Sequence, residues 1–298
     1  MVSRGMKSVL KILKENRKRE IKRRVEEGRS GLEELSRLAP LFKDSKLEKV
    51  DADGVPAAWV ITPEVAKDRA ILYLHGGGYI EGSIISHQDL AQRISSVSKT
   101  KVLLLDYRLA PEHPFPAALE DSISAYKWLI NSKGYNPTNL IIAGDSAGGG
   151  LTIATLVKLR DQGIPLPAAG VCLSPWTDLA LTGESMKLKI QEDPFVSPDG
   201  LMFDARLYLG KTDPKNPYAS PLYADFRGLP PLCIQVGSAE ILLDDATRLV
   251  KRAKEAGVEV QLDIWEGMIH VFQVFAVMAP EGREGINKIG EFIKKVFK

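Results

Sequence analysis

The chain has 298 residues, enough for one large domain or two small ones. Hydrophobic residues make up 44% and charged residues 26%, a balance typical of a globular protein with a full core. The net charge of +2 and the lack of interleaved aromatic and basic residues argue against a nucleic-acid partner. No apolar run approaches the roughly 20 residues of a membrane span, and the N-terminus lacks the apolar core of a secretion signal. We therefore expect no stable membrane insertion.

The first 27 residues are strongly basic, with ten Lys or Arg against four Glu. Apolar residues recur among these charges at helical spacing, at Met6, Leu10, Leu13, Ile21 and Val25. The pattern predicts helices over 4–27 and 31–39, broken at the sequence EGRSG, with a solvated basic face. Binding to a membrane surface is the less favoured alternative.

From about residue 47, short apolar runs alternate with longer helical stretches. Two hairpin-forming edge strands are predicted around Asp53 and Gly54. Further strands are predicted at 70–75, 101–107, 139–145, 169–175, 231–237 and 258–266. Helices are predicted at 86–99, 117–133, 146–162, 239–256 and 283–297. Because these strands are apolar on both faces, we expect an α/β fold with a mostly parallel, eight-stranded sheet covered by helices on both sides.

One long stretch departs from this alternation. Residues 178–228 contain no convincing strand and many Pro, Asp and Gly, with one helical run at 200–210. We expect an insertion that lies over one end of the sheet. The chain shows no internal repeat and no low-complexity linker, so it is predicted to form a single domain over 1–298.

The two cysteines, Cys172 and Cys233, lie in apolar strand-like runs. They are predicted to be buried free thiols, which favours a cytoplasmic location.

The sequence NLIIAGDSAGGG (139–150) leads from a predicted strand into a predicted helix and contains the pattern G-x-S-x-G. In this pattern a serine occupies a strained strand-to-helix turn, and the small neighbours two residues away allow the chain to bend sharply. The helix N-terminus supplies unpaired amides for a developing negative charge. Ser146 is therefore predicted to be a nucleophile. An ordinary glycine-rich turn is the alternative.

A serine hydroxyl needs a base, and the base needs an orienting acid. In this architecture both follow the serine, the acid first, and His270 is the only histidine after Ser146. Three carboxylates compete for the role of the acid. Glu240 lies at the tip of the preceding strand and is favoured, whereas Asp244 and Asp245 are expected to face solvent further along the helix.

A second glycine cluster, HGGGY (75–79), directly follows a predicted strand. Such a loop lets backbone amides approach a substrate oxygen, and with the amide of Ala147 it would form an oxyanion hole. A phosphate-binding loop is disfavoured because the Lys-Ser/Thr of that motif is missing.

Taken together, these motifs resemble those of the bacterial hormone-sensitive-lipase-like carboxylesterases of the α/β-hydrolase fold. The matching segments are HGGGY (75–79), DYRLAPEHPFPAALED (106–121), GDSAGG (144–149), SPWTDL (174–179), YASPLYAD (218–225) and GMIHVF (267–272). The resemblance implies a triad of Ser146, Glu240 and His270, although many members carry Asp at the acid position. That departure leaves Asp244 and Asp245 open.

The resemblance also implies roles for several other residues. The oxyanion donors would be Gly77, Gly78 and Ala147, with His75 and Gly76 supporting the loop. Residues 1–45 and roughly 178–228 would form a helical cap over an acyl pocket. Candidate pocket residues are Tyr79, Trp176, Met186, Phe195, Met202, Phe203 and Leu207.

The predicted activity is a serine carboxylesterase that acts on short-to-medium acyl esters and needs no metal or other cofactor. An amide or formamide hydrolase on the same site is one alternative. A ligand-binding member without catalysis is another, disfavoured because His270 is present. A homodimer through the last strand is the assembly that the resemblance suggests.

Overall fold

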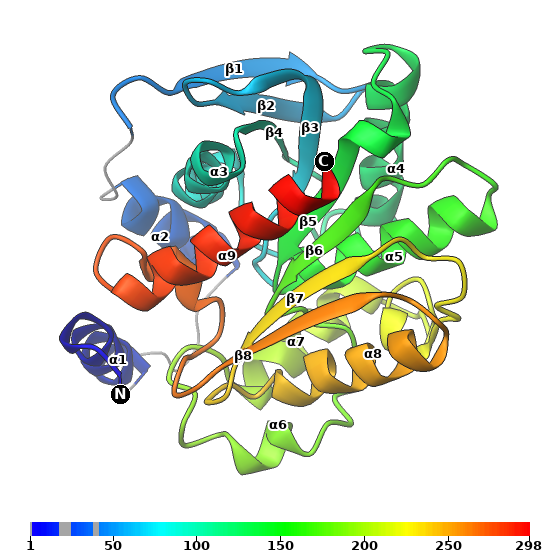
Figure 1. Ribbon diagram of the computed structural model, residues 1–298. Helices are drawn as coiled ribbons and strands as arrows, with labels where there is room; N and C mark the ends of the chain where they lie inside the picture. Colours follow the sequence, from blue (N-terminus) through cyan, green and yellow to red (C-terminus); the bar gives the residue numbers. More distant parts are fainter. Residues whose placement is uncertain (1, 18–24, 38–41) are drawn as a thin grey trace.

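The computed structural model describes residues 2–17, 25–37 and 42–298, which include a single eight-stranded sheet with helices on both faces (Figure 1). The strands are β1 (Lys46–Asp51), β2 (Pro56–Ile61), β3 (Ala66–Leu74), β4 (Thr100–Leu105), β5 (Leu140–Asp145), β6 (Ala169–Leu173), β7 (Leu232–Gly237) and β8 (Val260–Trp265). Their order across the sheet is β1-β2-β4-β3-β5-β6-β7-β8. Only β2 pairs antiparallel, with β1 on one side and β4 on the other. The predicted fold class is confirmed.

The hairpin at the start of the sheet differs in one respect from the prediction. Of its two strands, β1 lies at the edge of the sheet and β2 lies inside it. β1 has the sequence KLEKVD and is almost fully exposed, whereas four consecutive residues of β2, 57–60, are buried. β2 also pairs with β4, so both of its backbone edges are hydrogen-bonded. The apolar sequence of β2 suits an interior position, and the charged sequence of β1 suits the edge.

Helices cover both faces of the sheet (Figure 1). One face carries α3 (Ile84–Ser98) and α9 (Pro280–Val296), whose apolar side chains share a core with β3, β4 and β5. The other carries α4 (Ala117–Asn131), α5 (Ala147–Asp161) and α8 (Leu243–Glu255). The described residues also form three short 3-10 helices: η1 (Pro137–Asn139), η2 (Pro221–Tyr223) and η3 (Phe272–Phe275). Cys172 and Cys233 are buried free thiols, as predicted.

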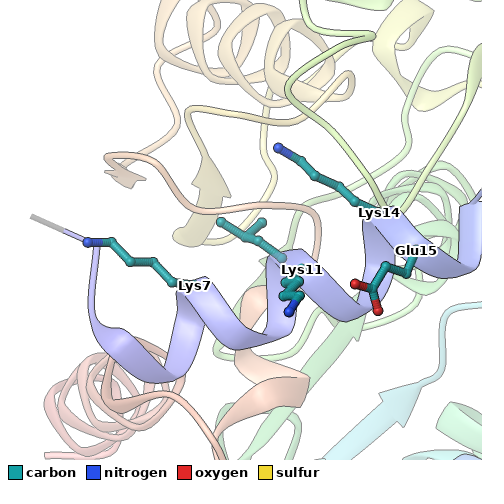
Figure 2. A pocket seen from close by; sticks show the side chains of 5 residues that line it. Lys7, Lys11, Lys14 and Glu15 are labelled. Atoms are coloured by element: carbon teal, nitrogen blue, oxygen red, sulfur yellow. The ribbon is translucent and has the colours of Figure 1, made fainter.

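The basic N-terminal segment forms α1 (Arg4–Arg17), an amphipathic helix as predicted. Met6 and Val9 are buried against a cluster that includes Met268 and Ile269. A hollow on α1 is lined by Lys7, Leu10, Lys11, Lys14 and Glu15 (Figure 2). All five lining residues belong to α1, and none of them is a predicted site residue. Residues 18–24 of the helix predicted over 4–27 lie outside the described residues.

The second helix, α2 (Val25–Arg37), runs through EGRSG, so the predicted break there is wrong. Tertiary contacts offset the low helix propensity of its glycines. Arg29 donates to the carbonyl of Ile80 (2.7 Å) and forms an ion pair with Glu112 (2.8 Å). A side chain at Gly28 would collide with the Glu81 carboxylate, so the glycine permits a close approach. Residues 38 and 39 of the predicted second helix lie outside the described residues.

The segment 178–228 contains no strand, as predicted, but two helices, α6 (Ser185–Leu188) and α7 (Pro198–Leu209). Ser185 Oγ donates to the carbonyl of Ile241 (2.6 Å), which attaches α6 to the segment after β7. Tyr208 of α7 stacks on Tyr79 beside the glycine loop, with ring centroids 3.7 Å apart. The insertion therefore lies against the carboxyl ends of the strands. In the described part of the chain, no helix is long and apolar enough to cross a membrane.

Candidate active site

Ser146 alone forms the corner between β5 and α5. Its φ of 53° lies in the left-handed region, which is strained for a residue with a side chain. The two flanking glycines permit this corner, because a Cβ on Gly144 would collide with the backbone of Gly148, and one on Gly148 with the carbonyl of Leu74. The G-x-S-x-G spacing thus reflects backbone packing on both sides of the serine.

The structure brings Ser146, His270 and Glu240 into one hydrogen-bonded chain. His270 Nε2 lies 2.9 Å from Ser146 Oγ, and His270 Nδ1 lies 2.6 Å from Glu240 Oε2. Both His270 and Glu240 are buried. His270 follows β8 in a loop that packs on α1, and Glu240 follows β7, so neighbouring strand ends present both side chains. This arrangement can remove a proton from the serine hydroxyl.

Burial disfavours the charged form of His270, but its surroundings more than offset that effect. The hydrogen bond that His270 donates to Glu240 and the negative charges of Glu240, Asp193 and Asp145 raise the pKa of His270 above its ordinary value of 6.5. The same charges favour the imidazolium that forms when the histidine accepts a proton.

Glu240 is itself held in place through its other oxygen. Oε1 accepts hydrogen bonds from Ser174 Oγ (2.9 Å) and from the amide of Gly237 (2.6 Å). Ser174 Oγ also accepts from the amide of Val271, next to His270 (3.0 Å). Sequence reasoning missed Ser174, although it opens the quoted motif SPWTDL. A serine after a strand gives no local signal that it supports an acid 66 residues away.

The two competing carboxylates lie elsewhere, and the expectation that Asp245 faces solvent is wrong. Asp245 is fully buried, and its carboxylate accepts from the amides of Thr177 (2.7 Å) and Asp178 (2.8 Å). Asp244 is half-buried and accepts from the amide of Ser185 (2.9 Å). Both carboxylates thus pair with backbone amides that a sequence pattern cannot assign to them.

The glycine loop after β3 is supported by two buried histidines. His75 Nδ1 lies 2.8 Å from the carbonyl of Gly76, and burial lowers the pKa of His75 to about 3, so this imidazole is neutral. The ring of Tyr107 stacks on His75, with centroids 4.2 Å apart. The amide of Gly76 lies 3.1 Å from Asp145 Oδ1 and 3.2 Å from His87 Nε2.

The three predicted oxyanion donors lie at the start of α5 and in this loop. Ala147 is the first residue of α5, where a backbone amide has no acceptor within the helix. Gly78 has a φ of 61°, which favours glycine, and Gly77 turns the chain so that its carbonyl accepts from the amide of Ile80 (3.0 Å). Within 2–17, 25–37 and 42–298, no acceptor is found for the amides of Gly77, Gly78 or Ala147.

The predicted pocket residues fall into two groups. Tyr79, Trp176 and Met186 are buried in the main core, and Leu207 packs against it. Phe195, Met202 and Phe203 are exposed. Of these three, Phe195 contacts the candidate site, with its ring centroid 6.1 Å from that of His270 and 5.8 Å from that of Phe275.

Comparisons with known proteins agree with this geometry. Residues 71–274 match a family described as having the alpha/beta hydrolase fold. The chain is 45% identical to an acetyl-hydrolase of Streptomyces hygroscopicus over 80% of this chain and 79% of that protein. It is 35% identical to an esterase of Acinetobacter venetianus over 88% of this chain and 86% of that protein.

Solved structures are similar over nearly the whole length. A crystal structure of an esterase from the bacterial hormone-sensitive lipase family has 47% identity and a TM-score of 0.96, covering 100% of both chains. A structure of the esterase EstE5, which was soaked with p-nitrophenyl butyrate, has 44% identity and a TM-score of 0.94, covering 99% of both chains.

Proposed function

The chain belongs to the bacterial hormone-sensitive-lipase family of carboxylesterases with the α/β-hydrolase fold, and we propose that it hydrolyses short-to-medium acyl esters through Ser146, His270 and Glu240. The observation that carries this proposal is the continuous chain of hydrogen bonds from Ser146 Oγ through His270 to Glu240, with distances of 2.9 and 2.6 Å. Glu240 is preferred as the acid because it, rather than Asp244 or Asp245, hydrogen-bonds the imidazole.

In the proposed acylation step, His270 Nε2 accepts the proton of Ser146 as the serine oxygen attacks the ester carbonyl. Glu240 keeps Nδ1 protonated and stabilises the imidazolium that forms. The carbonyl oxygen becomes negatively charged, and the amides of Gly77, Gly78 and Ala147 donate to it. Each such donor contributes about 10²–10³-fold in turnover. Collapse of the tetrahedral intermediate releases the alcohol, which takes its proton from His270, and leaves an acyl-enzyme.

The second half of the cycle repeats these steps with water. His270 removes a proton from a water molecule that attacks the acyl-enzyme carbonyl, and the same amides stabilise the second oxyanion. Ser146 leaves with the proton that His270 returns, and the carboxylic acid is released. Every proton transfer uses the imidazole of His270, so the whole cycle depends on its contact with Ser146.

Two comparisons support the preference for short acyl groups. A relative with 45% identity is an acetyl-hydrolase, and EstE5 was soaked with a butyrate ester. We propose that the described parts of 1–45 and 178–228 form the cap over the acyl group, with Phe195 beside His270. A cytoplasmic location is proposed from the two free thiols, and a homodimer through β8 stays a prediction for which sedimentation analysis is the test.

The proposal is tested with p-nitrophenyl esters from acetate to palmitate. The wild type is expected to hydrolyse the short members fastest, and Ser146→Ala should reduce turnover to near background while keeping the fold. The circular dichroism spectrum and the Tm of the variant provide the control. Substantial turnover by folded Ser146→Ala would rule out this nucleophile, and a maximum at palmitate would overturn the acyl-length proposal.

A further inference from the structure

Asp193 lies in the insertion between α6 and α7, and it is completely buried. Its Oδ1 accepts hydrogen bonds from the amides of Phe195 (2.9 Å) and Val196 (3.1 Å). Its Oδ2 accepts from the amide of Ile241 (3.0 Å), 48 residues away in the sequence. One carboxylate therefore ties the insertion to the loop that carries Glu240.

Both ends of this connection touch the surroundings of His270. Ile241 directly follows Glu240, whose Oε2 lies 2.6 Å from His270 Nδ1. Phe195, two residues after Asp193, has its ring against that of His270. The Asp193 carboxylate thus holds two backbone segments: the one next to Glu240 and the one that carries Phe195.

A second buried aspartate in the same insertion provides a comparison. Asp178 accepts from the amides of Ala180 (3.1 Å) and Thr182 (3.0 Å), as Asp193 does within its own turn. Its remaining partners are Tyr223 (2.9 Å) and Arg248 (3.0 Å), neither of which contacts the triad. Asp178 therefore has the same local turn function without the link to the catalytic loop.

We propose that Asp193 is a positioning residue for ester hydrolysis. It holds Glu240 and Phe195 in place beside His270, and its negative charge favours the imidazolium formed in the transition state. This proposal rests on the proposed function of Ser146, His270 and Glu240. It assigns to the insertion a part in the acid–base chemistry in addition to covering the substrate.

The charges around the imidazole agree with this role. Burial opposes protonation of His270, but the hydrogen bond and charge of Glu240 and the charges of Asp193 and Asp145 raise the pKa of His270. Glu240 follows β7, Asp145 ends β5, and Asp193 is contributed by the insertion. Lys189 and Glu192, which precede Asp193, form a surface ion pair with each other (3.0 Å).

The test compares Asp193→Asn with the matched control Asp178→Asn. Asparagine has only one acceptor oxygen, so the variant loses either the Ile241 bond or the turn bonds, together with the charge. We expect kcat on p-nitrophenyl butyrate to fall about 10–100-fold, because small misplacements of catalytic groups have effects of that size. When kcat/KM is plotted against pH, its rise at low pH (the acid limb) reports the loss of the proton from His270. Without the charge of Asp193, the imidazolium is less stable, so the acid limb should move to lower pH by about half a unit.

Asp178→Asn is expected to lower the Tm but to leave the position of the acid limb unchanged. Asp193→Glu keeps the charge, so its acid limb should stay near that of the wild type even where kcat falls. If Asp193→Asn does not fold, Asp193→Ser replaces it in the test, because the serine hydroxyl can still accept from the amides of Phe195 and Val196. The same fall in kcat and the same displacement of the acid limb are expected.

A folded Asp193→Asn or Asp193→Ser with the wild-type kcat and acid limb would overturn the positioning role. So would an equal displacement of the limb in Asp178→Asn. These outcomes leave the proposed function intact as long as the wild type hydrolyses the ester and Ser146→Ala does not. An inactive wild type would instead contradict the proposed function.

Discussion

Two buried histidine–carboxylate pairs lie near Ser146, one through His270 and the other through Asp145, the residue before the serine. His270 Nδ1 is 2.6 Å from Glu240, and His87 Nε2 is 3.3 Å from Asp145. The pairs differ in what the second ring nitrogen meets: His270 Nε2 contacts Ser146 Oγ, whereas His87 Nδ1 contacts Ser86 Oγ at 2.7 Å. The same two chemical groups therefore meet the proposed nucleophile in one place and a serine of α3 in the other, which fits the proton relay that we propose for the first pair and a structural role for the second.

The second pair belongs to the support of the glycine loop. Asp145 Oδ1 accepts from Tyr73 Oη (2.9 Å) and from the amide of Gly76 (3.1 Å). Although burial opposes ionisation, His87 and Tyr73 outweigh it and lower the pKa of Asp145. Its effect on hydrolysis would be indirect, through the position of the loop that contains Gly77 and Gly78.

The largest expected effect contrasts the two histidines. His270→Asn should lower kcat on p-nitrophenyl butyrate by about 10⁴–10⁶-fold, since the base is removed. His87→Asn should lower it by no more than about 10²-fold, the scale of one oxyanion donor, because it disturbs only the support of the loop. If both variants keep the native Tm and lose kcat equally, the two histidines do not have the different roles that we assign to them.

The next largest effect distinguishes the three carboxylates that the sequence left as candidates for the acid of the triad. Glu240→Gln should lower kcat by about 10²–10⁴-fold, because glutamine favours the wrong tautomer of His270. Asp244→Asn and Asp245→Asn should retain kcat within a few-fold, since both side chains accept from backbone amides in or next to the insertion and neither contacts His270. Steady-state kinetics at one pH, with Tm as the fold control, measures all three. A greater loss from Asp244→Asn or Asp245→Asn than from Glu240→Gln would reassign the acid.

The smallest effect concerns pH. His270 acts as a base only when neutral, and its pKa is raised because Glu240 and the nearby carboxylates outweigh burial. We therefore expect kcat/KM to rise with pH through a midpoint above the ordinary histidine value of 6.5. A pH profile with p-nitrophenyl acetate in buffers of constant ionic strength measures it. A midpoint at or below that value would contradict the electrostatic account of the relay.

The sequence by itself determined the succession of strands and helices along the chain, the parallel character of the sheet and the Ser146 corner. Each of these rests on a local pattern of apolar residues or glycines. It also singled out His270, since only one histidine follows the serine.

Tertiary structure alone decided which carboxylate meets His270, that β2 is an interior strand and that α2 continues through its glycines. It also brought Asp193 to the segment that carries Glu240 and paired His87 with Asp145. These features join residues tens of positions apart, and spacing along the chain does not specify them. They follow from the order of strands in the sheet and from the way the insertion packs over the strand ends.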